Sequence, residues 1–277
     1  MRGLPVVKAE VGPEGTPTVV LHGHLDVVPG LPGQFEPKLE DDRLYGRGAY
    51  DMKGAIAAML LVTAAMREQD RVRVRLGIVG DEESEEDVER GSDHLVDTGF
   101  TGDFAITGEP TDLHIGIEAK GVLALRLEIG GTAAHGATPW LGENAVLNAV
   151  DVFRSIESLP FARHSSELFD RPSINLGRIV GGDALNKVPD RCVIDVDIRY
   201  LPDQDPATIL GQVRELPGIG VEATELLTRP PAIVARDSPY VLALRAATAA
   251  HHDGEPMSVG RDGASDAVSF LRVGVPA

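Results

Sequence analysis

The stretch Thr18-Val19-Val20-Leu21-His22-Gly23-His24-Leu25-Asp26 decides the fold of this 277-residue chain. Its first four residues predict a β-strand, and polar residues follow where that strand ends. The strand-like runs 72–79 and 104–107 lead in the same way into Asp81-Glu82-Glu83 and Gly108-Glu109-Pro110. Because the carboxyl ends of parallel strands meet at one edge of an α/β sheet, we expect these polar side chains to converge.

The rest of the chain predicts two domains. The segment 54–66 is apolar enough for a buried helix, with Asp51 just ahead of it, and strands alternating with a helix favour a mostly parallel sheet. Further on, the order becomes strand 122–129, helix 144–159, strands 173–179 and 191–200, helix 206–215 and strand 220–227. This β-α-β-β-α-β order is that of a ferredoxin-like sandwich. Helices at 238–251 and 265–271 return to the first domain. We therefore predict an α/β protein with a catalytic domain at 1–118 and 232–277 and an inserted domain at 119–231.

Composition narrows the class of partner. The net charge of −17, from 43 acidic and 26 basic residues, repels nucleic acid and anionic lipid. We see no apolar run approaching the roughly 20 residues of a membrane span and no signal peptide, so we expect no nucleic acid, no membrane and a cytoplasmic location. With one cysteine, Cys192, any metal must rely on histidine and carboxylates.

The polar segments contain the ligands that a two-zinc hydrolytic site needs. Catalytic zinc takes His and carboxylate ligands and leaves a position open for water. His24 can bind one ion while Asp26 accepts a hydrogen bond from its other ring nitrogen, and Asp51 can bridge two ions. Glu82 and Glu83 point opposite ways in an extended segment, so one can ligate while the other faces the water. Taken singly, Asp51 could instead be a helix N-cap and His24 a buried core histidine.

These motifs resemble a known family. His24-Leu25-Asp26, the GRGAYDMKG stretch at 46–54, Asp81-Glu82-Glu83 and Gly108-Glu109-Pro110 are similar to the successive motifs of the zinc aminoacylase and carboxypeptidase family, which includes acetylornithine deacetylase and succinyl-diaminopimelate desuccinylase. The resemblance implies a zinc-exopeptidase-like catalytic domain with a lid and dimerisation domain. It implies that His24 and Glu109 hold one zinc, Asp51 bridges, Glu83 helps to hold the second and Glu82 is the general base.

The resemblance extends to the inserted domain. Gly131-Thr132-Ala133-Ala134-His135-Gly136 is similar to the family's lid motif, whose histidine reaches the partner subunit's site and polarises the oxyanion, which implies a homodimer. Asn186 and Arg199 resemble residues that bind substrate. Arg199 suits a substrate α-carboxylate, although on a strand it could instead pair with Asp195 or Asp197. The segment 263–267, with Gly263 and Ser265, is similar to the family's substrate-binding loop.

We therefore expect a hydrolase that cleaves the amide bond of N-acyl amino acids or small peptides, with two Zn2+ per subunit and Co2+ or Mn2+ as substitutes. The family usually carries a further histidine beyond the point where this chain stops, at Ala277, and a helical segment before its start. We expect a chain truncated at both ends, with a weakened second zinc site. The alternative is a non-catalytic relative that binds amino-acid derivatives or only dimerises. The intact Glu82 opposes it, because a binding protein needs no general base. A two-metal hydrolase acting on phosphate or lactam bonds fits the acidic composition poorly.

Overall fold

The computed structural model describes residues 6–84, 90–216, 222–251 and 254–277. The chain forms two compact units. The first comprises 1–117, 233–259 and 265–277, and the second comprises 118–232 and 260–264. The segment 260–264, predicted to lie in the catalytic domain, thus belongs to the second unit.

The first unit is built on a four-stranded sheet in the order β1-β5-β2-β6. Its strands are β1 (Val7–Val11), β2 (Thr18–His24), β5 (Arg73–Val79) and β6 (Phe104–Thr107). β2 runs parallel to both β5 and β6, whereas β1, which the sequence pattern did not predict, pairs antiparallel with β5. The predicted mostly parallel sheet is confirmed, and β2 extends further than predicted, to His24.

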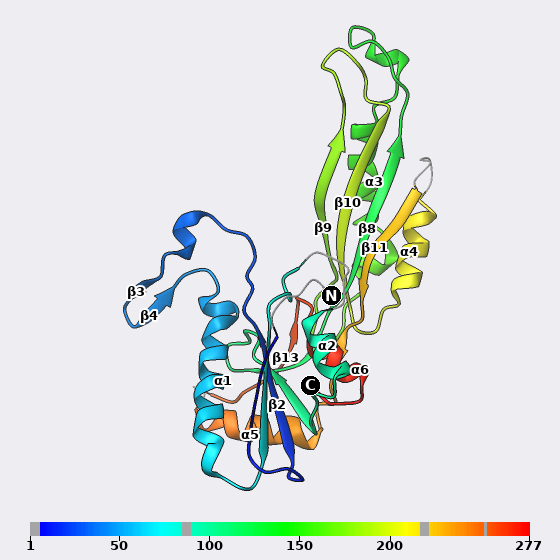
Figure 1. Cartoon of the computed structure of the whole chain (residues 1–277). Helices are drawn as coiled ribbons and strands as arrows, with labels where there is room; N and C mark the ends of the chain where they lie inside the picture. Colours follow the sequence, from blue (N-terminus) through cyan, green and yellow to red (C-terminus); the bar gives the residue numbers. More distant parts are fainter. Residues whose placement is uncertain (1–5, 85–89, 217–221, 252–253) are drawn as a thin grey trace. The chain divides into compact units, whose positions relative to one another are not determined.

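Helices cover both faces of this sheet. α1 (Gly54–Ala65) packs on one face, where Leu21, Ile56 and Leu76 are buried together. α2 (Gly91–Asp97) and α6 (Ala267–Arg272) lie on the other face, as Figure 1 shows, around Val20 and Phe270. Successive residues of β2 therefore point into two different cores, which explains why its sequence is continuously apolar rather than alternating.

α1 corrects one expectation. The helix is found where it was predicted, but it is not buried all round, because Leu60, Leu61 and Val62 are exposed. The helical stretch 49–68 is also long and apolar enough, by length and composition alone, to cross a membrane, so the statement that the chain has no such run was wrong. In this structure the stretch packs Met52, Ile56 and Met59 against the sheet.

Five short strands and one helix make up the remaining described strands and α-helices of the first unit and of the points where the chain passes between the two units. They are the hairpin β3 (Lys38–Glu40) and β4 (Arg43–Tyr45), helix α5 (Pro239–Ala249), and the short strands β7 (Ile115–Ala119), β12 (Ala232–Ile233) and β13 (Ser258–Arg261), which pair in the order β12-β7-β13. α5 and α6 correspond to the helices predicted at 238–251 and 265–271. None of the strands in this group was predicted.

The second unit is a ferredoxin-like sandwich. Its elements follow one another as β8 (Gly121–Gly130), α3 (Ala145–Ile156), β9 (Ser173–Gly181), β10 (Arg191–Tyr200), α4 (Pro206–Arg214) and β11 (Glu222–Arg229). The strands pair antiparallel in the order β11-β8-β10-β9. Asn144 and Asp205 cap the two helices by accepting backbone N–H groups, which is why both helices begin where they do. The start predicted for the last strand, 220–221, lies outside the described residues.

Candidate metal centre

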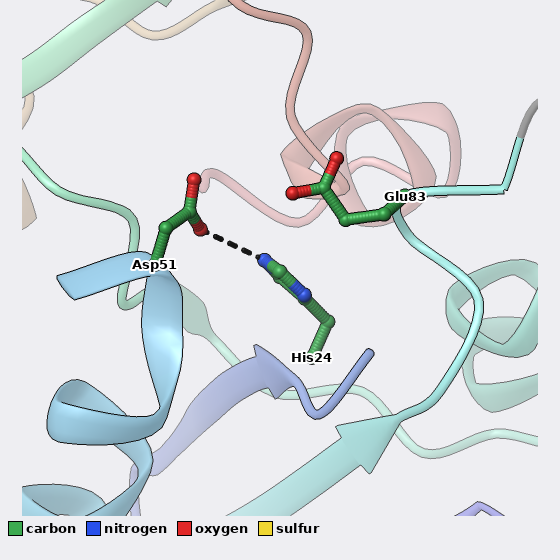
Figure 2. Close-up of side chains that lie close together, drawn as sticks. All are labelled: His24, Asp51 and Glu83. Carbon is green, nitrogen blue, oxygen red and sulfur yellow. Dashed lines mark hydrogen bonds and ion pairs between the residues drawn. The ribbon is translucent and has the colours of Figure 1, made fainter. Parts of the chain in front are cut away.

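Three potential metal ligands converge at one edge of the first unit's sheet. His24 ends β2, Glu83 follows the parallel neighbour β5, and Asp51 lies in the short π-helix Ala49–Lys53 ahead of α1. β2 and β5 are in register up to the pair His24 and Val79, so their carboxyl ends are adjacent. Figure 2 shows the three side chains pointing toward one another, and one ligand atom from each lies within 4.8 Å of the other two. The geometry that the strand ends predicted is thus present for these residues.

The imidazole of His24 is oriented by two aspartates. Its Nε2 lies 3.1 Å from Asp51 Oδ1, whereas its Nδ1 lies 3.1 Å from the backbone oxygen of Asp26 and 3.4 Å from Asp26 Oδ1. Asp26 Oδ2 accepts the backbone N–H of Glu83 at 2.8 Å. Asp26 therefore orients the ring of His24 and the backbone of Glu83, while Nε2 of His24 faces the centre of the group. Asp51 is not a helix cap, since its side chain faces His24.

The surrounding carboxylates control the charge of His24. Burial alone would lower the pKa of His24, but the hydrogen bond with Asp26 and the negative charges of Glu82 and Glu109 raise this pKa to about 9. For Asp26 burial acts in the opposite direction and on its own would raise the pKa. The hydrogen bonds from His24 and from the backbone N–H of Glu83 nevertheless hold the pKa of Asp26 below its usual range. The group thus concentrates negative charge around one imidazole, an environment that favours a cation.

The donor set fits a divalent metal. One imidazole and two carboxylates are the ligands of hydrolytic zinc sites, and one coordination position stays open in such a set. Two ligand atoms on a single zinc ion are at most roughly 4.4 Å apart, given bonds of about 2.0–2.2 Å. The observed spread, up to 4.8 Å, is close to that limit, so only a small inward movement is needed. His24, Asp51 and Glu83 would thus each supply a ligand to the metal centre.

This arrangement predicts how metal affinity depends on pH. Metal binds the neutral imidazole, and the pKa of His24 is raised to about 9 in the metal-free protein, so binding must displace a proton at neutral pH. The apparent affinity should therefore rise roughly tenfold per pH unit from pH 6 to pH 8 and level off above about pH 9. Competition with a chromophoric chelator at each pH measures it. An affinity that does not change between pH 6 and pH 8 contradicts the raised pKa.

Glu82, Glu109 and Ser265 are the remaining predicted residues of the first unit. Glu82 and Glu109 are close enough for their charges to raise the pKa of His24, but neither belongs to the group of three. The predicted pairing of Glu109 with His24 on one ion therefore stays a prediction. Ser265, predicted to bind substrate, is buried, and its Oγ accepts the backbone N–H of Ala267 at 3.2 Å.

The second unit holds the other predicted residues. The segments of His135 and Asn186 run side by side: Gly136 N–H donates to the backbone oxygen of Asn186 at 2.7 Å, and His135 forms a β-bridge with Lys187. His135 Nδ1 accepts the N–H of Ala137 at 3.1 Å, which places the ring proton of the neutral imidazole on Nε2, as an oxyanion donor requires.

Arg199 pairs with an aspartate on its own strand, which is the alternative that the sequence left open. Its Nε donates to Asp197 Oδ2 at 3.0 Å. Asp195 is bound instead by Arg126 and Arg178, so it leaves Asp197 as the carboxylate for Arg199. Gly263 lies in the segment 260–264 of this unit, beside the guanidinium of Arg261. The structure thus groups His135 with Asn186 and gives Arg199 a structural partner.

Sequence reasoning missed a buried polar cluster behind the metal ligands. His22 and Asp266 are buried, with Nε2 and Oδ2 3.5 Å apart, and burial keeps His22 neutral by lowering its pKa to about 3. Burial raises the pKa of Asp266. Asp81 Oδ2 accepts the N–H of Gly91 at 2.8 Å. The alternation of His22 and His24 along one strand was a signal for the first of these residues, and Asp266 lies within the segment 263–267, for which we predicted substrate binding through Gly263 and Ser265.

Fold and site together define a metal-dependent hydrolase with an α/β catalytic unit and a ferredoxin-like second unit. The model of peptidase family M20/M25/M40 matches residues 20–277, and the chain belongs to this family. It is 34% identical to a succinyl-diaminopimelate desuccinylase of Erythrobacter litoralis, over 94% of this chain and 71% of that protein. It is 31% identical to a putative succinyl-diaminopimelate desuccinylase of Mycobacterium tuberculosis, over 94% of this chain and 72% of that protein. An M20 family metallo-carboxypeptidase from Sulfolobus solfataricus shares the fold, with a TM-score of 0.73 and 19% identity over 99% of this chain and 79% of that one.

Proposed function

We propose that this chain cleaves the amide bond of N-acyl amino acids, of the desuccinylase or deacetylase type, or of small peptides, and that its metal is zinc. The observation that carries the proposal is the convergence of His24, Asp51 and Glu83 beside a further carboxylate, Glu82. The desuccinylase of Erythrobacter litoralis, the relative with 34% identity, supports an acylated amino acid as substrate.

The chain's own residues divide the chemistry between them. Zinc, when bound, would lower the pKa of a water molecule and polarise the substrate carbonyl. Glu82 takes the proton from the attacking water and returns it to the leaving amine nitrogen. His135, with its proton on Nε2, donates to the oxygen on which negative charge develops. Arg199 offers the guanidinium fork for the substrate carboxylate, and Asp197 holds its Nε.

Two ions per subunit are part of this proposal. Asp51 would be shared by the two ions, His24 and Glu109 would complete the ligands of one ion, and Glu83 would be a ligand of the other. Support comes from the charge of Glu109 beside His24 and from the position of Glu83 in the group of three. Co2+ and Mn2+ share the preference for nitrogen and oxygen ligands and can substitute for Zn2+.

A homodimer formed through the second unit is also part of the proposal. β9 ends the strand order of the sheet, so its outer edge has no strand partner within the described ranges. Ile179 and Val180 on β9 and Leu147 and Val150 on α3 are exposed apolar residues. We further propose a cytoplasmic location, since a chain with the single Cys192 has no internal disulfide.

The proposal predicts metal-dependent turnover. Purified protein loaded with Zn2+ or Co2+ should hydrolyse N-succinyl or N-acetyl amino acids or dipeptides, and a chelator should abolish at least about 99% of the rate, because the hydrolysis needs the metal. Restoring the metal should restore the rate. The free amine released from a panel of such substrates is the readout. If the metal binds but no member of the panel is cleaved, the chain is a binding protein rather than an enzyme.

A further inference from the structure

The backbone that follows β5 carries two adjacent carboxylates, Glu82 and Glu83, and such a segment needs support. Like charges on neighbouring residues repel, and this segment is a turn rather than the extended segment that we predicted, with one backbone hydrogen bond of its own, from the N–H of Ser84 to the oxygen of Asp81 at 3.3 Å. Asp26 supplies one support by accepting the backbone N–H of Glu83 at 2.8 Å. A misplacement of either carboxylate by about 1 Å is enough to cost a large factor in rate.

Arg90 supplies a second support for the segment. Its guanidinium donates to the backbone oxygen of Glu82, and its Nη2 donates to the backbone oxygen of Ser84 at 3.2 Å. These two carbonyl groups flank Glu83. The rigid guanidinium fork therefore binds the backbone on both sides of a metal ligand.

The charge of Arg90 is balanced inside the protein. Its side chain is only 13% exposed, and its Nη1 lies 3.9 Å from Oδ1 of Asp266, a buried residue just ahead of α6. Arg90 itself directly precedes α2, and α2 is tied to α6 by Ser269, which donates to Asp93 at 2.9 Å. A buried cation with this carboxylate partner is held in one orientation, so it can hold the segment beside it.

We propose that Arg90 is a positioning residue that fixes the Glu82–Ser84 backbone and, through it, the general base and a metal ligand. Arg90 belongs to none of the motifs that mark the site in the sequence. It acts through main-chain hydrogen bonds, with Asp266 as its counter-ion. The part of this inference that concerns catalysis rests on the proposed function; the part that concerns the backbone does not.

Hydrogen exchange in the metal-free protein tests the backbone claim independently of activity. Arg90→Met should speed amide exchange in a peptide covering 80–84 by about tenfold or more, because the fork that holds this segment is removed. The matched control is Arg272→Met, which removes an exposed arginine bound to Asp97 and Asp93 on the same pair of helices. It should leave exchange in 80–84 unchanged. Equal exchange in Arg90→Met and wild type overturns the proposal.

Kinetics and metal binding test the consequence. Arg90→Met should lower zinc affinity or kcat by about 10–100-fold, the usual effect of removing an outer-shell partner, with KM within about twofold of wild type. Arg90→Lys keeps the charge that faces Asp266 but lacks the fork, so it should give intermediate values. If Arg90→Met does not fold, Arg90→Lys decides, and wild-type exchange in 80–84 then contradicts the proposal. A wild-type protein without turnover would refute the proposed function and leave the exchange result standing.

Discussion

Glu82→Gln is expected to lower kcat for hydrolysis of an N-acyl amino acid by about 10²–10⁴-fold while the protein keeps its metal. Glutamine preserves the shape and the hydrogen-bonding oxygen of the side chain but cannot accept a proton. Glu82 is the third residue after the end of β5 and precedes Glu83, and it is close enough for its charge to act on His24. The loss should therefore fall on the chemical step, with KM changed little.

Two matched variants separate the role of Glu82 from general effects of charge. Glu83→Gln removes a carboxylate from the group of three ligands, so it should weaken metal binding as well as turnover. Glu68→Gln changes an exposed glutamate after α1 and should leave both unchanged. Metal content by atomic emission and kcat are measured for all three. If Glu82→Gln retains more than about a tenth of wild-type kcat, another residue is the base.

The parts of the fold that could be predicted are those whose pattern reflects burial. β2, β5 and β6 are parallel strands. Apolar runs identified β2 and β6, alternation at the strand period identified β5, and the polar residues after these strands identified the edge of the site. The second unit could be predicted because its helices are capped by Asn144 and Asp205 and its two central strands, β8 and β10, alternate between buried and less buried residues.

The rest depended on contacts between distant parts of the chain. α1 is apolar on nearly every side, so its composition could not tell which face is buried, and Leu61 proved to be exposed. Arg90 and Asp266 come from separate segments and meet only because α2 and α6 share one face of the sheet. Arg199 could pair with either Asp195 or Asp197 on its strand. It pairs with Asp197, because Arg126 and Arg178 bind Asp195.

The second large effect is expected for Asp51→Ala, which should abolish measurable metal binding and turnover together. Asp51 is the only one of the three ligands that is proposed to contact both ions, and its Oδ1 lies 3.1 Å from the Nε2 of His24. Without Asp51 no ligand is shared between the two ions, and each ion loses one ligand. We therefore expect metal affinity to fall by at least about 10²-fold. Isothermal titration with Zn2+ measures the affinity.

The control for Asp51→Ala is Asp70→Ala, an exposed aspartate beyond α1 whose loss should change neither metal affinity nor kcat. The comparison with Glu83→Gln then distinguishes one ion from two. If Asp51 bridges, Asp51→Ala should lose both ions, whereas Glu83→Gln should lose the second ion and keep the one held by His24, Asp51 and Glu109. Stoichiometry near one for Glu83→Gln and near zero for Asp51→Ala is thus expected for a bridged pair. Loss of the same single ion in both variants would mean that His24, Asp51 and Glu83 hold one metal in common and that Glu109 is not a ligand.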